Sequence, residues 1–193
     1  MSGEVANRES ILIAIIAAAG DDGLGRVQLQ KSAFLVGEEF QGRLPENFYR
    51  FRPYMYGPFA QEIYADVERL SDGPIIETFF GEDGRPFYRL ARDARSWRYS
   101  LSTDLEGVVK RVVGWVSRMS SFDELVRAIY LLYPEQRENS VFDYSEDLAE
   151  EESLVRSFRD MAAGRTRPVD ELIVELQDRD SDEAQTGSIH TRV

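Results

Sequence analysis

The stretch FRPYMYGPFAQEIYADVERL, residues 51–70, decides the fold of this chain. Its first part is rich in aromatic residues and interrupted by proline, which is typical of a short strand or extended segment. The Tyr56-Gly57-Pro58 turn follows, and Pro58 is predicted to be the first residue of a helix, where a missing N–H costs nothing. One buried face of that helix is predicted by apolar residues spaced four and three apart, namely Phe59, Ile63, Val67 and Leu70.

Two further helices are predicted upstream, over residues 7–19 and 27–40, with Asn7 or Ser10 as the N-cap of the first. Downstream, PIIETFF and RPFYRLA flank GEDG, which indicates a β-hairpin over residues 74–91. DDGLG, between the first two helices, is expected to be a turn. This order predicts a mostly helical α+β fold, a winged helix-turn-helix domain over residues 5–98 with the hairpin as its wing.

A helical extension is predicted over residues 99–178. Ser102 or Thr103 caps its first helix with Glu106 reaching back, Ser121 and Glu124 form the corresponding pair in the second, and Pro134 ends that helix. SEDLAEEESLVRSFRDMAAG predicts a further helix, and PVDELIVELQ a short one. The acidic and polar tail, residues 179–193, has few large apolar residues and is expected to be disordered.

The composition excludes several classes of protein. There is no cysteine for a disulfide or thiolate site, and the only histidine, His190, is the fourth residue from the end of the sequence. The apolar run at residues 11–19 has nine residues, where a membrane span needs roughly twenty, so it predicts a core helix of a cytoplasmic protein. P-loop, His-Glu-x-x-His and Gly-x-Ser-x-Gly motifs are missing, so no enzyme activity, cofactor or metal is predicted.

The formal net charge of −12 argues against general binding to nucleic acid. Residues 1–98 hold 12 basic and 15 acidic residues, and residues 99–193 hold 11 and 20. Contact with phosphates would therefore need a local basic patch. The strongest one contains a single acid, Asp93, and five arginines: Arg85, Arg89, Arg92, Arg95 and Arg98. Two interpretations of these arginines are open. They could form ion pairs within or between subunits, which we favour, or the wing could contact nucleic acid through them.

The outward face of the helix after Pro58 is expected to be acidic. If its apolar stripe faces the core, the outward positions include Gln61, Glu62, Asp66, Glu68 and Arg69. Three carboxylates against one arginine disfavour binding in the DNA major groove. We interpret Glu62, Asp66 and Glu68 as a solvated face or as a docking surface for a basic partner.

A second acidic segment, DYSEDLAEEE at residues 143–152, holds six acids and no base. The common interpretation is a solvated helix start. The sharper hypothesis is an acidic surface that occupies a partner's nucleic-acid site or active site, formed by Asp143, Glu146, Asp147, Glu150 and Glu151.

The aromatic residues of the central segment also allow two interpretations. Interleaved with Arg50 and Arg52, they could form a stacking platform for single strands, but aromatics beside a turn are more often core. We expect Phe51 and Phe59 to be buried, and the hydroxyl of Tyr54 or Tyr56 to form a hydrogen bond near the turn. The full set is Phe48, Tyr49, Phe51, Tyr54, Tyr56 and Phe59.

Four segments together resemble a known family, the bacterial YwgA-like winged-helix proteins, and more distantly the SocA-like Panacea antitoxin domains. They are LQKSAFLVGEEF, FYRFRPYMYGPFAQEIYADVERLSDGPIIE, YRLARDAR and SFDELVRAIYLLYPEQRENS, and the resemblance covers about residues 10–140. The closer family implies no established activity. The Panacea domains imply a protein that neutralises a toxin, or an accessory role in phage defence, and neither family supplies catalytic residues.

We therefore expect a non-enzymatic interaction module of the antitoxin-like or phage-defence type, which binds a protein partner through acidic surfaces. The alternative is a DNA-binding winged-helix regulator that contacts phosphates through the arginines at 85–98, and that dimerises through the helices after residue 102.

Overall fold

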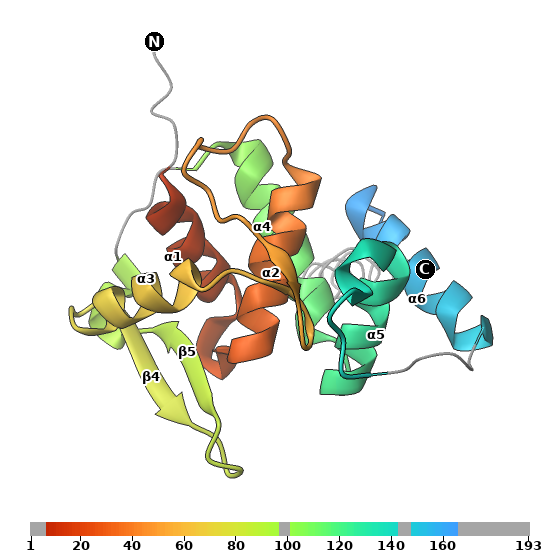
Figure 1. Cartoon of the computed structure of the whole chain (residues 1–193). Helices are drawn as coiled ribbons and strands as arrows, with labels where there is room; N and C mark the ends of the chain where they lie inside the picture. Colours follow the sequence, from red (N-terminus) through yellow and green to blue (C-terminus); the bar gives the residue numbers. More distant parts are fainter. Residues whose placement is uncertain (1–6, 97–100, 143–147, 166–193) are drawn as a thin grey trace, which may run out of the picture.

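The computed structural model describes residues 7–96, 101–142 and 148–165, which form a mostly helical α+β fold (Figure 1). The α-helices of this part are α1 (Arg8–Ala18), α2 (Arg26–Glu39), α3 (Glu62–Ser71), α4 (Thr103–Ser117), α5 (Phe122–Leu132) and α6 (Leu148–Ala162). The strands are β1 (Leu24–Gly25), β2 (Arg52–Tyr54), β3 (Gly57–Phe59), β4 (Ile76–Phe80) and β5 (Pro86–Leu90). Short 3-10 turns form η1 (Gly20–Asp22), η2 (Arg92–Ser96) and η3 (Pro134–Arg137).

Helix α1 lies at the centre of the core and confirms the predicted core helix. All six residues from Ile11 to Ile16 are buried, because α2, α4 and β5 surround the helix. A helix that is apolar all round belongs in such a position. Its start is fixed by the Asn7 side chain, whose Oδ1 accepts a 2.7 Å hydrogen bond from the Ser10 N–H.

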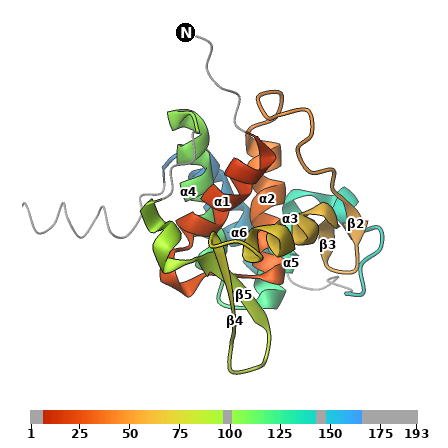
Figure 2. The same cartoon turned by 90° about the vertical axis from the view of Figure 1, so that its left-hand side faces the viewer.

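The predicted hairpin is confirmed as β4 and β5, which project below the helices (Figure 2). They belong to a three-stranded antiparallel sheet in the order β1-β5-β4. The expectation of a plain turn at DDGLG was incomplete, because Leu24 and Gly25 pair with Tyr88 and Phe87 of β5 as strand β1. Gly23 precedes this strand with φ of 65° and lies directly against the backbone of Tyr88.

A second, two-stranded hairpin is formed by β2 and β3 and corrects the prediction that Pro58 begins a helix. Pro58 is the middle residue of β3 and faces Pro53, and α3 begins only at Glu62. The short strand predicted in this segment is confirmed by β2. The turn lies at Met55 and Tyr56, and Gly57, which was expected to supply it, is the first residue of β3 with φ of 86°. Phe59, the first residue of the apolar stripe predicted for the helix, lies on the same strand.

The helices of the second half pack onto those of the first. Helix α4 contacts α1 and α2, and α6 contacts α4 and α5, so buried residues of both halves belong to one hydrophobic core. Ser102 and Ser121 cap α4 and α5 as predicted. The two acids differ from the capping-box expectation: Glu106 pairs with Lys110, and Glu124 accepts hydrogen bonds from Ser120.

Helix α6 confirms the predicted helix in SEDLAEEESLVRSFRDMAAG, whereas the segment PVDELIVELQ and the tail lie outside the described residues. Within the described ranges, no helix is long and apolar enough to cross a membrane.

Candidate interaction surface

Two polar side chains of α2 fix the β2–β3 hairpin to the core. The Gln30 amide makes two hydrogen bonds with Ala60, accepting from its N–H at 3.0 Å and donating to its carbonyl at 2.9 Å. The neighbouring Lys31 Nζ donates to the Pro58 carbonyl at 3.1 Å. These bonds hold the peptide groups of residues 58–60 in an extended conformation, which explains why the helix cannot begin at Pro58.

Lys31 is a buried amine with no carboxylate partner among the described residues. Its side chain is 3% exposed, and burial lowers the pKa of the amine to about 7. Gly57 passes directly over it, since a Cβ there would lie 3.4 Å from Nζ and 3.2 Å from the Tyr130 ring. The close approach of hairpin, Lys31 and Tyr130 therefore requires glycine at this turn.

The prediction that Asp66 faces outward is wrong. Asp66 is 3% exposed and joins α3 to the start of α1, with its carboxylate 2.8 Å and 3.0 Å from the Arg8 guanidinium nitrogens. The Tyr49 hydroxyl and Arg69 each donate to it at 2.8 Å. Burial raises the pKa of the Asp66 carboxyl, but the hydrogen bonds from Arg8, Arg69 and Tyr49 outweigh this effect and leave the pKa below its ordinary value.

The sequence contains a signal for this burial. Asp66 lies three residues after Ile63 and four before Leu70, so it falls within the apolar stripe of α3. A carboxylate in such a stripe requires buried partners. Arg8 and Tyr49, which supply them, lie far away in the sequence and could not be identified from spacing.

The exposed face of α3 is nevertheless acidic. Glu62 and Glu68 are exposed as predicted, and Asp72 follows at the end of the helix. The only cation of this helix, Arg69, is held by Glu9 at 3.1 Å as well as by Asp66. The charges of α3 that remain available to a partner are therefore carboxylates.

The structure brings two of the five predicted arginines into internal ion pairs. Arg89 forms two 3.1 Å hydrogen bonds with Glu77 across the hairpin and lies over the Phe79 ring. This pairing raises the pKa of Arg89 and lowers that of Glu77. Arg85 pairs with Asp83 at 3.2 Å, and Arg92 is exposed on η2.

The remaining predicted residues are placed only in part. Arg95 is on η2 and Glu150 and Glu151 are at the start of α6, where the structure describes the backbone alone. Arg98, Asp143, Glu146 and Asp147 lie outside the described residues.

The aromatic segment is less buried than expected. Phe51 and Phe59 are half-buried, and Tyr54 and Tyr56 are 46% and 40% exposed. Within the described part of the chain neither of these two hydroxyls forms a hydrogen bond; Tyr49 and Tyr130 use theirs instead, on Asp66 and the Met55 carbonyl. We call the four exposed apolar residues gathered here the turn patch: Tyr54, Met55, Tyr56 and Val141.

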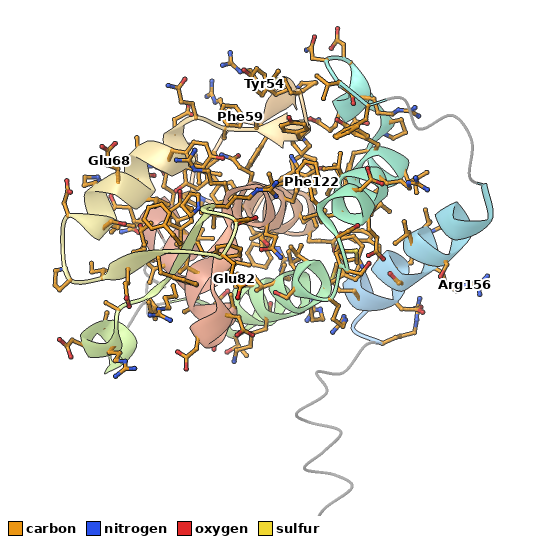
Figure 3. The ribbon with its side chains drawn as sticks, turned by 90° about the horizontal axis from the view of Figure 1, so that it is seen from below. Tyr54, Phe59, Glu68, Glu82, Phe122 and Arg156 are labelled. Atoms are coloured by element: carbon orange, nitrogen blue, oxygen red, sulfur yellow. The ribbon has the colours of Figure 1, made fainter. Side chains whose placement is uncertain are left out.

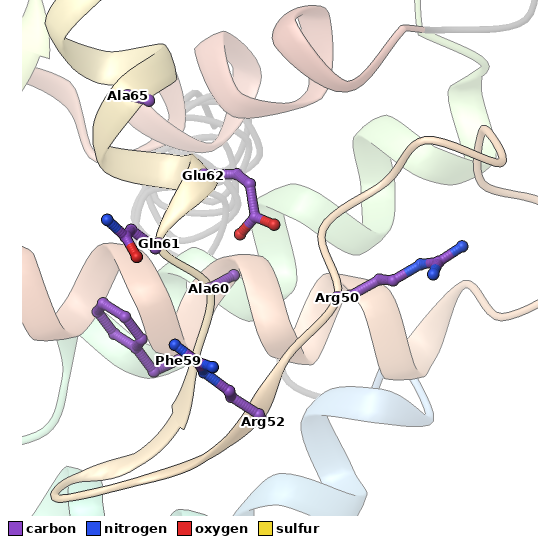
Figure 4. Close-up of a pocket in the computed structure, with 7 residues that line it drawn as sticks. All are labelled: Arg50, Arg52, Phe59, Ala60, Gln61, Glu62 and Ala65. Carbon is purple, nitrogen blue, oxygen red and sulfur yellow. The ribbon is translucent and has the colours of Figure 1, made fainter.

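The outer face of the hairpin borders a groove of about 520 Å³ at the start of α3 (Figure 4). Arg50 and Arg52 line one wall, Gln61 and Glu62 the other, and the rest of the lining is Phe59, Ala60 and Ala65. Figure 3 shows Tyr54 and Phe59 together on the hairpin, with Glu68 farther along α3. Among the described residues neither Arg50 nor Arg52 has an ion pair or hydrogen bond.

No match is found for the chain among protein-family models, curated proteins or solved structures. In the described ranges, acidic and histidine side chains form no group of three that could hold a metal ion. Any inference about what this surface binds therefore rests on its own residues.

Proposed function

We propose that the chain is a non-enzymatic protein-interaction module, antitoxin-like or accessory to phage defence, which binds a basic protein partner through acidic surfaces. The observation that carries this proposal is the exposed face of α3, where Glu62, Glu68 and Asp72 are available and Arg69 is already paired. A face of this kind repels phosphates and attracts cationic side chains. The neighbouring turn patch supplies apolar area of the kind found at protein interfaces.

We further propose that residues 5–98 form a winged helix-turn-helix domain. The order α1, β1, α2, α3, β4, β5, with the extra β2–β3 hairpin inserted between α2 and α3, supports this assignment, as does a β4–β5 hairpin paired with β1 in one sheet. In such a domain α3 stands where a DNA reader has its recognition helix. The carboxylates of α3 favour a protein, and not DNA, as the molecule that this helix contacts.

The proposal is tested with a tagged full-length chain and two charge-reversal variants. The partner is first captured from the host cell and purified, and its affinity is then measured by calorimetry. Glu62→Lys/Glu68→Lys is expected to weaken binding at least about tenfold. Glu46→Lys/Glu82→Lys changes the net charge equally at exposed positions elsewhere and is expected to leave the affinity within about twofold. Equal effects of both pairs would refute binding through α3.

The second candidate function is a DNA-binding regulator, which the winged-helix element order and the exposed Arg92 favour. It predicts a sequence-specific shift of duplex DNA that survives competitor DNA and is lost in Arg85→Glu/Arg89→Glu/Arg92→Glu. Our proposal predicts no such shift at physiological salt. A specific shift that depends on these arginines would replace the interaction module with the regulator.

A further inference from the structure

The β2–β3 hairpin and the residue before it present two cations and an aromatic ring to solvent. Alternate residues of a strand point to the same side, and in β2 these are Arg52 and Tyr54, both exposed. Arg50 is also exposed, but it precedes the strand and its side chain extends in another direction (Figure 4). Phe51 and Pro53 between them are half-buried. No carboxylate lies on the outer face of this segment, although the chain as a whole has a net charge of −12.

The facing strand extends this surface. Phe59 is the cross-strand partner of Arg52, so the two side chains lie on the same side of the hairpin. The Phe59 ring centroid is 5.1 Å from that of Tyr54 and 5.8 Å from that of Tyr64. Arg26 lies over the Tyr64 ring at 5.4 Å. The guanidinium groups of Arg50 and Arg52, which have no ion pair or hydrogen bond among the described residues, and the partly exposed rings of Tyr54 and Phe59 therefore adjoin the groove of about 520 Å³.

We propose that this groove, lined by Arg50, Arg52 and Phe59 with Tyr54 beside it, binds single-stranded nucleic acid. Guanidinium groups contact the phosphates, and the rings of Tyr54 and Phe59 provide surfaces on which bases stack. The volume is within the range of about 300–1,000 Å³ that accommodates small ligands, so it admits a nucleotide unit of the strand. This inference does not rest on the protein-binding function proposed above, although the two surfaces share Glu62 and Tyr54.

The charges around the groove select a single strand over a duplex. A flexible strand can follow the hairpin and keep its phosphates on the Arg50–Arg52 wall, away from Glu68 farther along α3 (Figure 3). A rigid duplex would bring its second strand toward the acidic face of α3. Glu62 lies in the opposite wall, where its carboxylate repels phosphate but accepts hydrogen bonds from the N–H groups of a base edge.

The test uses fluorescence anisotropy of the full chain with a fluorescein-labelled, mixed-sequence single-stranded oligonucleotide of about 12 nucleotides. Saturable binding is expected, weakening as salt is raised from about 50 to 200 mM, and the annealed duplex is expected to bind less tightly at every salt concentration. Absence of binding to the single strand at the lowest salt would overturn the proposal, and so would tighter binding of the duplex.

Two variants localise the binding to the groove. Arg50→Gln/Arg52→Gln is expected to reduce the slope of log K against log salt by about 1.4, because each phosphate contact to a single strand contributes about 0.7. Tyr54→Ser is expected to weaken binding at least about fivefold by removing a stacking surface. The matched control, Arg118→Gln/Arg159→Gln, removes two exposed arginines, one directly after α4 and one on α6, and should leave the slope unchanged. Equal slopes for the two double variants would contradict the site.

Two more measurements separate this inference from its alternatives. Glu62→Gln should tighten binding of the oligonucleotide, because it removes a charge that repels phosphate. The same variant should weaken binding of the protein partner, because that partner is attracted by the carboxylate. Polyglutamate is used as a competitor at a charge concentration equal to that of the oligonucleotide. It should displace little of the oligonucleotide, because it has no bases to stack; displacement as effective as that by unlabelled oligonucleotide would reassign the groove to an acidic peptide.

Discussion

Lys31 illustrates at the scale of a single residue how this core accepts a polar group. Its amine has one hydrogen-bond acceptor, the Pro58 carbonyl, and a pKa lowered to about 7 by burial. The unfolded chain binds this proton more tightly, since the ordinary pKa is 10.5. The stability of the protein is therefore reduced progressively as pH falls from about 10.5 to about 7, and this contribution is constant below pH 7.

Replacing Lys31 by methionine should remove this pH dependence. We expect Lys31→Met to raise the free energy of unfolding by roughly 2–4 kcal/mol at pH 6.5. Near pH 10 the gain should disappear. The amine of the folded wild-type protein is then largely neutral, and the variant lacks its hydrogen bond to the Pro58 carbonyl. Urea unfolding at several pH values measures this. Lys110→Met, at the exposed lysine of α4, is the control and should show no such trend; a destabilised Lys31→Met at pH 6.5 would contradict the account.

Gly23 and Gly42 provide a matched pair at the same scale. Both have positive φ, 65° and 74°, which penalises any other residue. A Cβ at Gly23 would lie 2.6 Å from the Tyr88 carbonyl oxygen, whereas one at Gly42 would meet nothing within 4 Å. Gly42→Ala should cost about 1 kcal/mol from backbone strain alone. Gly23→Ala should cost about 3 kcal/mol or more, because β1 must also separate from β5, and thermal denaturation distinguishes the two.

At the scale of elements, the helices were predicted from apolar runs, apolar spacing and caps, and the long hairpin from two β-prone runs joined by the turn GEDG, because each of these signals extends over several residues. Strand β1 has only two residues and exists because β5 lies beside it, so no local pattern could reveal it. Strand β3 was mistaken for a helix start because Pro58 suits both. The deciding bonds come from Gln30 and Lys31, 30 and 27 residues earlier.

The docking of the β2–β3 hairpin should therefore depend on Gln30. Gln30→Ala leaves the Ala60 N–H without its acceptor, and the loss of such a buried bond costs about 1–3 kcal/mol. The Ala60 carbonyl loses the shorter of its two hydrogen bonds and keeps the one from the Ile63 N–H at 3.3 Å. We expect faster amide hydrogen exchange from residue 52 to 62, with α4 and α5 much less affected. Gln41→Ala removes an amide whose only hydrogen bond within the described part of the chain is an exposed one to Glu38, and should leave the exchange unchanged. Uniform acceleration over all helices would indicate global destabilisation instead.

The outer face of this hairpin was recognisable in part. The alternation of Arg52 and Tyr54 is visible in the sequence, and an extended segment with this alternation predicts one shared face. The groove itself was not visible, because α3 forms its second wall and its start depends on where β3 ends.

At the scale of the whole molecule, the elements from α1 to β5 and the helices α4 to α6 share one core. Val109, Val112, Val113 and Val116 of α4 are almost fully buried, and α4 packs on α1 and α2. Separating residues 1–100 from the rest would expose the apolar side of α1 and α2 that α4 covers. Each such side chain contributes about 1.5–3 kcal/mol when buried. Exposing several of them therefore costs as much as the usual stability of a folded domain, about 5–15 kcal/mol.

We therefore expect the isolated fragment 1–100 to lack a cooperative thermal transition in circular dichroism, although its sequence has the pattern of an autonomous domain. Mixing it with fragment 101–193 should restore the transition, because the interface of α1 and α2 with α4 is regained. An equimolar mixture with Val112→Asp/Val116→Asp in the second fragment is the control and should fail to recover it, since both side chains are buried in that interface. A cooperative transition of fragment 1–100 alone, at a temperature close to that of the full chain, would instead mean that the first half folds without the extension.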